Sequence, residues 1–153
     1  MVLYHFYSEN YFNAPIEKVW AILDDAESWP KWFKGFKKID LVSHETKSKV
    51  GSVLDCEVKG DLPYTLRFRL KVTFYDPPQK MKYEAWGDLK GTGKWELETK
   101  NGGTLVKYYW DVGITNFFFN LIGKIPSIKR MMEKNHDKVM DDAFENMMRI
   151  LQT

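Results

Sequence analysis

One run of alternating residues constrains the fold of this chain more than any other feature. From Tyr64 to Phe74, apolar side chains occupy every second position, and Thr, Arg and Lys occupy the positions between them. A period of two is typical of a strand with one face buried and the other in water, as in antiparallel sheets. The chain is therefore predicted to build a sheet whose apolar face needs another element to cover it.

Further runs of apolar and aromatic residues predict the rest of this sheet. Turn residues such as Pro77-Pro78 and Asn101-Gly102-Gly103 separate these runs. Including the run from Tyr64 to Phe74, we expect about seven strands. The others are predicted over Tyr4–Phe12, Phe36–His44, Leu54–Val58, Lys80–Trp86, Leu89–Thr99 and Thr104–Val112.

Helical patterns flank the sheet. Pro15 is predicted to open a helix, because Ile16, Val19, Trp20 and Leu23 follow it on one apolar stripe. A second short helix is expected over 28–33. After Pro126 a helix of about 25 residues is predicted. Its apolar stripe comprises Met132, His136, Val139, Met140, Ala143, Phe144, Met147, Ile150 and Leu151.

The order of these elements predicts an α+β fold. We expect the long last helix to cover the concave face of a curved antiparallel sheet, because that packing buries its apolar stripe. A chain of 153 residues is long enough for one domain with its own core, so residues 1–153 are interpreted as a single domain.

Composition and motifs exclude several classes of function. With 23 basic and 21 acidic residues, the chain has no overall charge that would indicate a nucleic-acid partner. The single Cys56 excludes a disulfide framework, and His5, His44 and His136 are too scattered to suggest a metal site. No glycine-rich nucleotide motif is present. We therefore expect no metal and no cofactor.

The chain shows no sign of a targeting or membrane-spanning segment. Its first residues lack a basic region followed by an apolar run. The most apolar stretch, 116–128, is shorter than the roughly 20 residues that a spanning helix needs. These features favour a cytoplasmic protein.

Several motifs resemble those of the START-like, or helix-grip, superfamily. Residues 13–20 look like its N-terminal signature, and Trp29-Pro30-Lys31-Trp32 looks like its second-helix motif. Residues 91–97 and 103–106 are similar to its penultimate hairpin. Residues 135–140 are similar to a last-helix motif of bacterial proteins grouped as polyketide cyclase/dehydrase and lipid transport. The resemblance implies a seven-stranded curved antiparallel sheet around a long C-terminal helix, with two short helices between the first and second strands.

This resemblance also implies a cavity between the sheet and the last helix, open near the second helix. Aromatic residues on the inward face of the strands, and methionines on the helix stripe, would then line a site for an apolar ligand. The alternative is that they only fill the core. The predicted ligand-binding residues are Trp32, Phe36, Phe68, Tyr83, Trp95, Tyr108, Trp110, Met132, His136 and Met140.

Two features leave further alternatives open. His136, on the apolar stripe, is either a core histidine with a local hydrogen-bond partner or a polar contact for a ligand. Phe117, Phe118 and Phe119 precede Lys124, Lys129 and Arg130. They either cap the end of the core or make transient contact with an anionic membrane surface.

The function that we favour is binding or transport of a hydrophobic small molecule, such as a lipid, an isoprenoid or a polyketide. The alternative is an aromatase/cyclase-type enzyme on the same scaffold, with His136 as an acid or base. No residue is assigned a catalytic role, because no convergent catalytic set is visible. Glu84 shares a face with Lys82 and Trp86, and we expect this to be the outer face. If Glu84 points inward instead, it is the best candidate for an acid.

Overall fold

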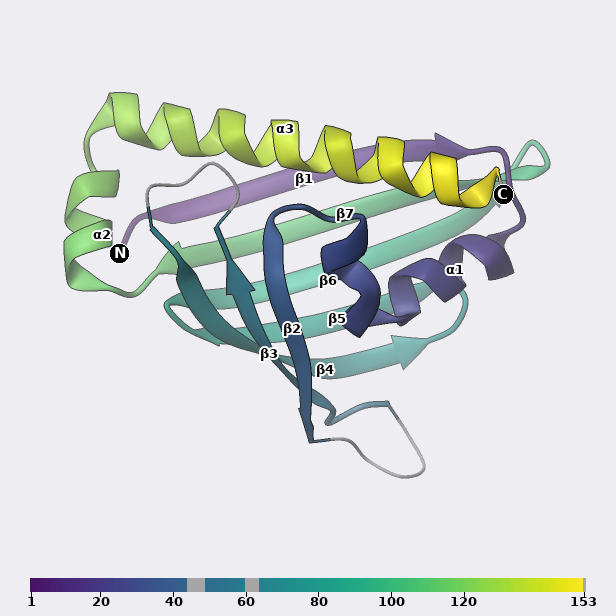
Figure 1. Cartoon of the computed structure of the whole chain (residues 1–153), viewed down its shortest axis with the longest axis horizontal. Helices are drawn as coiled ribbons and strands as arrows, with labels where there is room; N and C mark the ends of the chain where they lie inside the picture. Colours follow the sequence, from purple (N-terminus) through teal and green to yellow (C-terminus); the bar gives the residue numbers. More distant parts are fainter. Residues whose placement is uncertain (44–48, 60–63, 153) are drawn as a thin grey trace.

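The computed structural model describes residues 1–43, 49–59 and 64–152. In this part of the chain, seven antiparallel strands form one sheet in the order β1-β7-β6-β5-β4-β3-β2 (Figure 1). Neighbours along the chain therefore pair from β2 to β7, and β1 joins the free edge of β7. The strands are β1 (Leu3–Phe12), β2 (Phe36–Ser43), β3 (Val53–Val58), β4 (Leu66–Asp76), β5 (Lys80–Gly87), β6 (Leu89–Lys100) and β7 (Gly103–Ile114).

Helices close this sheet from its inner side. They are α1 (Ile16–Asp24), the 3-10 helix η1 (Ala26–Lys31), α2 (Phe117–Gly123) and α3 (Pro126–Leu151). In Figure 1, α3 runs beside β1 along the length of the molecule. The helix α2 lies at one end of this assembly, and α1 and η1 lie toward the other. This arrangement confirms the predicted α+β helix-grip architecture.

The long helix follows its sequence pattern closely. α3 begins with Pro126 in its first turn and spans 26 residues, against about 25 expected. Met132, Met140, Ala143, Phe144 and Met147 are its buried residues. Most of the apolar stripe read from the sequence therefore packs against the sheet. Ile150, in the last turn of α3, differs from the prediction because it is 43% exposed.

The inward face of β4 differs from the prediction at Phe74. Strict alternation places this side chain in the core, but it is 41% exposed. The pairing of β4 with β5 shifts between Val72 and Phe74, which indicates a β-bulge. A bulge changes which face the following residues occupy. Phe74 therefore points outward, and Tyr75 packs against Trp20 with ring centroids 5.8 Å apart.

Several boundaries also differ from the prediction. The second short helix is the 3-10 helix over Ala26–Lys31 instead of 28–33. Tyr64 lies outside β4, and His44, the last residue of the second predicted strand, lies outside the described residues. The helix α2 was not predicted, although Asn116 caps it by accepting a hydrogen bond from the backbone NH of Phe119.

One half of the space between α3 and the sheet is solid. The indole ring of Trp29 in η1 lies between strands and helices, 6.3 Å from Trp95 and 6.0 Å from Tyr83 between ring centroids. Its Nε1 donates to the carbonyl of Leu23 at 3.0 Å, which fixes η1 to α1. These large side chains fill the half of the molecule farther from α2.

Candidate ligand-binding pocket

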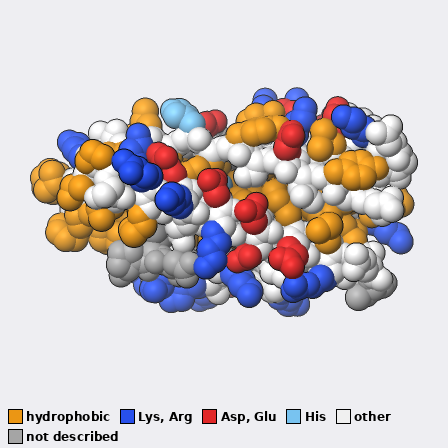
Figure 2. All heavy atoms as spheres, turned by 90° about the horizontal axis from the view of Figure 1, so that it is seen from above, with side chains coloured by type: hydrophobic (Ala, Val, Ile, Leu, Met, Phe, Trp, Pro, Cys, Tyr) orange, Lys and Arg blue, Asp and Glu red, His pale blue; other side chains and the backbone are white. Residues whose placement is uncertain are grey.

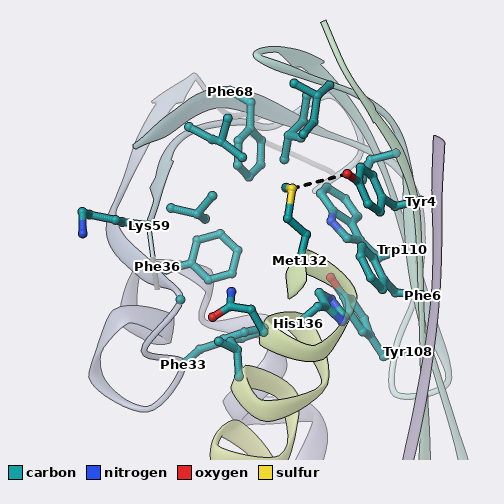
Figure 3. Close-up of a pocket in the computed structure, with 18 residues that line it drawn as sticks. Tyr4, Phe6, Phe33, Phe36, Lys59, Phe68, Tyr108, Trp110, Met132 and His136 are labelled. Atoms are coloured by element: carbon teal, nitrogen blue, oxygen red, sulfur yellow. Dashed lines mark hydrogen bonds between the residues drawn. The ribbon is translucent and has the colours of Figure 1, made fainter. Parts of the chain in front are cut away.

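A pocket of about 120 Å³ lies between α3 and the sheet, in the half nearer α2 (Figure 3). Its walls come from the inner faces of β1, β3, β4 and β7, from the first residues of β2 and β6, from the segment between η1 and β2, and from α3. The lining residues are Tyr4, Phe6, Phe33, Gly35, Phe36, Val58, Lys59, Leu66, Phe68, Leu89, Tyr108, Trp110, Val112, Ile114, Met132, Asn135, His136 and Val139. All but a few of these side chains are apolar, and Figure 3 shows the ammonium group of Lys59 pointing away from the pocket.

The aromatic wall is set by cross-strand pairing of β1, β7 and β6. Phe6 pairs with Trp110, and Trp110 pairs on its other side with Gly93. A Cβ atom at Gly93 would lie 2.8 Å from the indole ring of Trp110. Because glycine has no side chain, the indole can lie flat over this strand, which fixes one wall of the pocket.

Two polar groups on α3 face this apolar pocket without partners. Among the described residues, Asn135 Oδ1 and His136 Nδ1 are buried and make no hydrogen bond. Burial lowers the pKa of His136 from 6.5 to about 4, so the imidazole is neutral at pH 7. The expected local hydrogen-bond partner of a core histidine is therefore missing at Nδ1, and a buried polar atom without a partner is unusual.

Tyrosine hydroxyls complete the polar part of the pocket. Burial raises the pKa of Tyr108 above its usual value, and burial also raises that of Tyr4, so both are neutral phenols at pH 7. The Tyr4 hydroxyl donates to the sulfur of Met132 at 3.3 Å, the contact drawn in Figure 3. Among its described lining residues, the pocket thus offers neutral hydrogen-bonding groups and no fully buried charge, which suits an uncharged polar group on a ligand.

The structure brings together six of the ten predicted ligand-binding residues. Phe36, Phe68, Tyr108, Trp110, Met132 and His136 line the pocket. The other four, Trp32, Tyr83, Trp95 and Met140, are buried outside its lining. They occupy the solid half of the molecule, where Trp29 and its neighbours fill the space that the resemblance assigned to a longer cavity.

Sequence reasoning missed several residues of the pocket, chiefly Tyr4, Phe6 and Asn135. Strand β1 carries aromatic residues on both faces, since Tyr7 and Tyr11 are exposed while Tyr4 is buried. Alternation of polarity therefore could not identify its inner face. Asn135 precedes His136 in the last-helix motif and lies at the edge of the apolar stripe, which was the available signal.

Two other residues with reactive side chains, Cys56 and Glu84, lie outside the pocket lining. Burial raises the pKa of the Cys56 thiol to about 12, which makes it a poor nucleophile. Glu84 is exposed on the outer face, as predicted.

Within the part of the chain that the structure describes, no group of three or more potential ligands could hold a metal ion. The described helices include none long and apolar enough to cross a membrane.

A second surface feature lies at the α2 end of the molecule. Phe117 and Phe118 are 80% and 61% exposed, and Leu121, Ile125 and Met131 are also exposed. Figure 2 shows hydrophobic side chains gathered at this end, with basic side chains beside them. Phe119 differs from its neighbours, because its ring stacks on Tyr64 with centroids 3.8 Å apart. Phe119 therefore caps the core, as one sequence interpretation expected, whereas Phe117 and Phe118 do not.

A curved antiparallel sheet that grips one long helix, with an apolar pocket between them, defines the helix-grip class of protein. The family model described as "Polyketide cyclase / dehydrase and lipid transport" matches residues 5–151. The chain belongs to this family. No curated protein matches the sequence.

Solved structures share this fold at low sequence identity. TTHA0849 from Thermus thermophilus has a TM-score of 0.76 and 17% identity, covering 96% of this chain and 99% of its own. A START superfamily protein from Mycobacterium smegmatis has a TM-score of 0.74 and 14% identity, covering 97% of each chain. The Zhui aromatase/cyclase from Streptomyces sp. R1128 has a TM-score of 0.75 and 14% identity, covering 99% of this chain and 94% of its own. At these identities the likeness shows the fold alone.

Proposed function

We propose that this protein binds and carries a hydrophobic small molecule with at least one polar group, such as a lipid, an isoprenoid or a polyketide-like compound. The observation that carries this proposal is the pair of unpartnered buried atoms, Asn135 Oδ1 and His136 Nδ1, at the wall of an otherwise apolar pocket. A hydroxyl group of the ligand would supply the missing partner, because it can donate to Asn135 Oδ1 and accept from His136 when Nδ1 carries the proton.

Energetics support binding by this pocket. Leaving a buried polar group without a partner costs about 1–3 kcal/mol, so a ligand that pairs with it relieves that cost on binding. The apolar lining contributes about 25 cal/mol for each Å² of ligand surface removed from water, before the cost of ordering the ligand. The apolar wall thus supplies affinity, and the α3 pair supplies orientation.

An aromatase/cyclase-type enzyme is the second candidate, because His136 is a titratable group at the pocket wall. A general base works best when its pKa lies near the operating pH. The pKa of His136, at about 4, makes the imidazole a weak base. The low pKa of His136 therefore favours ligand binding over catalysis as the function. Replacement His136→Gln distinguishes the two: a cyclase that uses this ring would lose most of its turnover, and preserved turnover would remove the catalytic role.

The exposed apolar end of α2 supports contact with an anionic membrane surface as part of the same function. Phe117 and Phe118 project from α2, and exposed Lys124, Lys129 and Arg130 lie close by in the chain. Aromatic side chains bordered by cations suit the interface of a bilayer that carries anionic lipids. A carrier would use such contact to load or release an apolar ligand.

Native mass spectrometry of freshly purified protein tests the binding proposal, followed by extraction and identification of any bound compound. A stoichiometric apolar passenger with a polar group is the expected result. If the protein carries nothing, and its tryptophan fluorescence does not respond to lipids, isoprenoids or polyketide-like aromatics, the proposal is wrong. Because Trp110 lines the pocket, occupancy is expected to change that fluorescence.

A further inference from the structure

A second apolar space adjoins the pocket on the α2 side. It is a groove of about 280 Å³, lined by Tyr64, Phe118, Phe119, Ile122, Ile128, Met131 and Met132. Among the described residues that line it, only Tyr64 has a side chain with a hydrogen-bonding N or O atom, its hydroxyl. The groove lies between α2, the start of α3 and the segment just before β4, so it is built from different elements than most of the pocket.

Met132 is the side chain that the pocket and the groove share. Its sulfur accepts from the Tyr4 hydroxyl at 3.3 Å on the pocket side and from the Tyr64 hydroxyl at 3.6 Å on the groove side. Figure 3 shows Met132 projecting from α3 into the space between the walls. Among the described residues, Met132 therefore lies at the boundary between the two spaces.

This partition is held by weak contacts. A thioether sulfur is a weak acceptor, and methionine has three rotatable side-chain bonds, so it adapts its shape more readily than other core residues. A change of the Met132 rotamer would break two O–H···S contacts and leave the backbone of α3 in place. The opening of a passage at this point therefore has a low cost.

The volumes of the pocket and the groove indicate why a passage between them matters. The pocket has a volume of about 120 Å³ and the groove one of about 280 Å³. Typical ligand pockets have volumes of about 300–1,000 Å³. Neither space reaches that range alone, whereas the two joined spaces do. The polar atoms of Asn135 and His136 lie in the pocket, so polarity decreases from the pocket toward the groove.

We infer that the pocket and the groove are two compartments of one elongated site, joined when Met132 moves, and that the ligand is a single-chain amphiphile. Its polar group pairs with Asn135 and His136, and its apolar chain passes Met132 into the groove under α2. This inference rests on the proposed function, because it uses the same pocket for the polar end of the ligand.

Binding of a series of straight-chain primary alcohols to the full chain, measured below their solubility limits, tests this inference. In the wild-type protein we expect affinity to rise by about fourfold for each added methylene group, and to continue rising past the length that fills the pocket. Met132→Phe places a larger and stiffer side chain at the partition. Affinity in this variant is expected to stop rising at a shorter chain length than in the wild-type protein.

A second variant and a matched control guard against effects on folding. Ile122→Gln alters the groove far from the polar pair, and it should lower affinity for long alcohols only. Met148→Phe makes the same change on an exposed part of α3, and it should alter the affinity for neither short nor long alcohols. If affinity levels off at the same short length in wild type and in Met132→Phe, the joined site is wrong and the proposed function stands. If no alcohol of any length binds, the joined site is wrong, and the panel of lipids, isoprenoids and polyketide-like aromatics decides whether the proposed function stands.

Discussion

The imidazole ring of His136 stacks on the phenyl ring of Phe6, with centroids 3.8 Å apart and planes inclined by 13°. The ring of Tyr108 is also nearly parallel to it, at 6.3 Å and 10°. Packing between aromatic rings thus orients the histidine, while its Nδ1 makes no hydrogen bond among the described residues. Stacking therefore fixes the imidazole ring, and Nδ1 stays available for a hydrogen bond to a polar group of a ligand.

Replacement His136→Phe separates these two roles. The phenyl ring keeps the stacking and removes both nitrogens, so the empty protein should gain about 1 kcal/mol in free energy of unfolding. Affinity for ligands with a hydroxyl or carbonyl group should fall by about threefold to tenfold. Chemical denaturation and ligand titration measure the two changes. A variant that is less stable and binds with unchanged affinity would show that the nitrogen serves the fold.

His136 also makes stability depend on pH in a defined direction. Its pKa is about 6.5 in the unfolded chain and about 4 in the folded protein. Between these values only the unfolded chain takes up the proton, so protonation favours unfolding. The contribution of His136 to the free energy of unfolding is fully present above about pH 6.5 and is lost as pH falls toward 4. The total loss is on the order of 3 kcal/mol.

Denaturation of wild type and His136→Phe across this pH range isolates that contribution, since other titrating groups act equally on both proteins. The difference in free energy of unfolding between wild type and variant should shift in favour of the variant as pH falls from 6.5 to 4. A difference that stays constant across the range would contradict a buried neutral imidazole.

The double replacement Phe117→Ser and Phe118→Ser tests contact with a membrane surface. Both side chains are mostly exposed, so stability should change by less than about 0.5 kcal/mol. Co-sedimentation with vesicles containing anionic lipid should decrease by about tenfold or more, because each phenyl ring loses apolar burial in the interface. Phe74→Ser, on the outer face of the sheet, is the matched control and should sediment as wild type.

Salt provides a second readout of the same contact. Raised ionic strength should weaken wild-type sedimentation, because Lys124, Lys129 and Arg130 attract anionic lipid only within a screening length of about 10 Å at 0.1 M. Vesicles of neutral lipid alone should bind less. Equal sedimentation of the double variant and wild type on anionic vesicles would rule out α2 as the contact.

Met140→Ala tests the distinction between core and pocket. Met140 is fully buried on α3, one turn beyond His136, and it lies outside the pocket lining. Removal of its side chain should lower the free energy of unfolding by about 2–5 kcal/mol. Ligand affinity, measured where the protein is folded, should be unchanged. A loss of ligand affinity without a loss of stability would show that Met140 contacts the ligand.

Local patterns were sufficient to predict most of the fold. The alternation between Tyr64 and Phe74 and the stripe from Met132 to Leu151 each reflect a fixed geometric period, so they identified β4 and α3 with small errors at their ends. The prediction for Phe74 was wrong because a bulge depends on pairing with β5, which the sequence of β4 alone does not contain.

The sequence by itself determined which faces of the strands and of the last helix are apolar, because side-chain direction follows the period of the backbone. Only the tertiary structure decided which apolar residues line a pocket. Trp95 and Trp110 both belong to the expected inner face, yet Trp29 fills the space beside Trp95, while the space beside Trp110 stays open. That difference depends on where η1 lies against the sheet, which is set by packing between residues far apart in the chain.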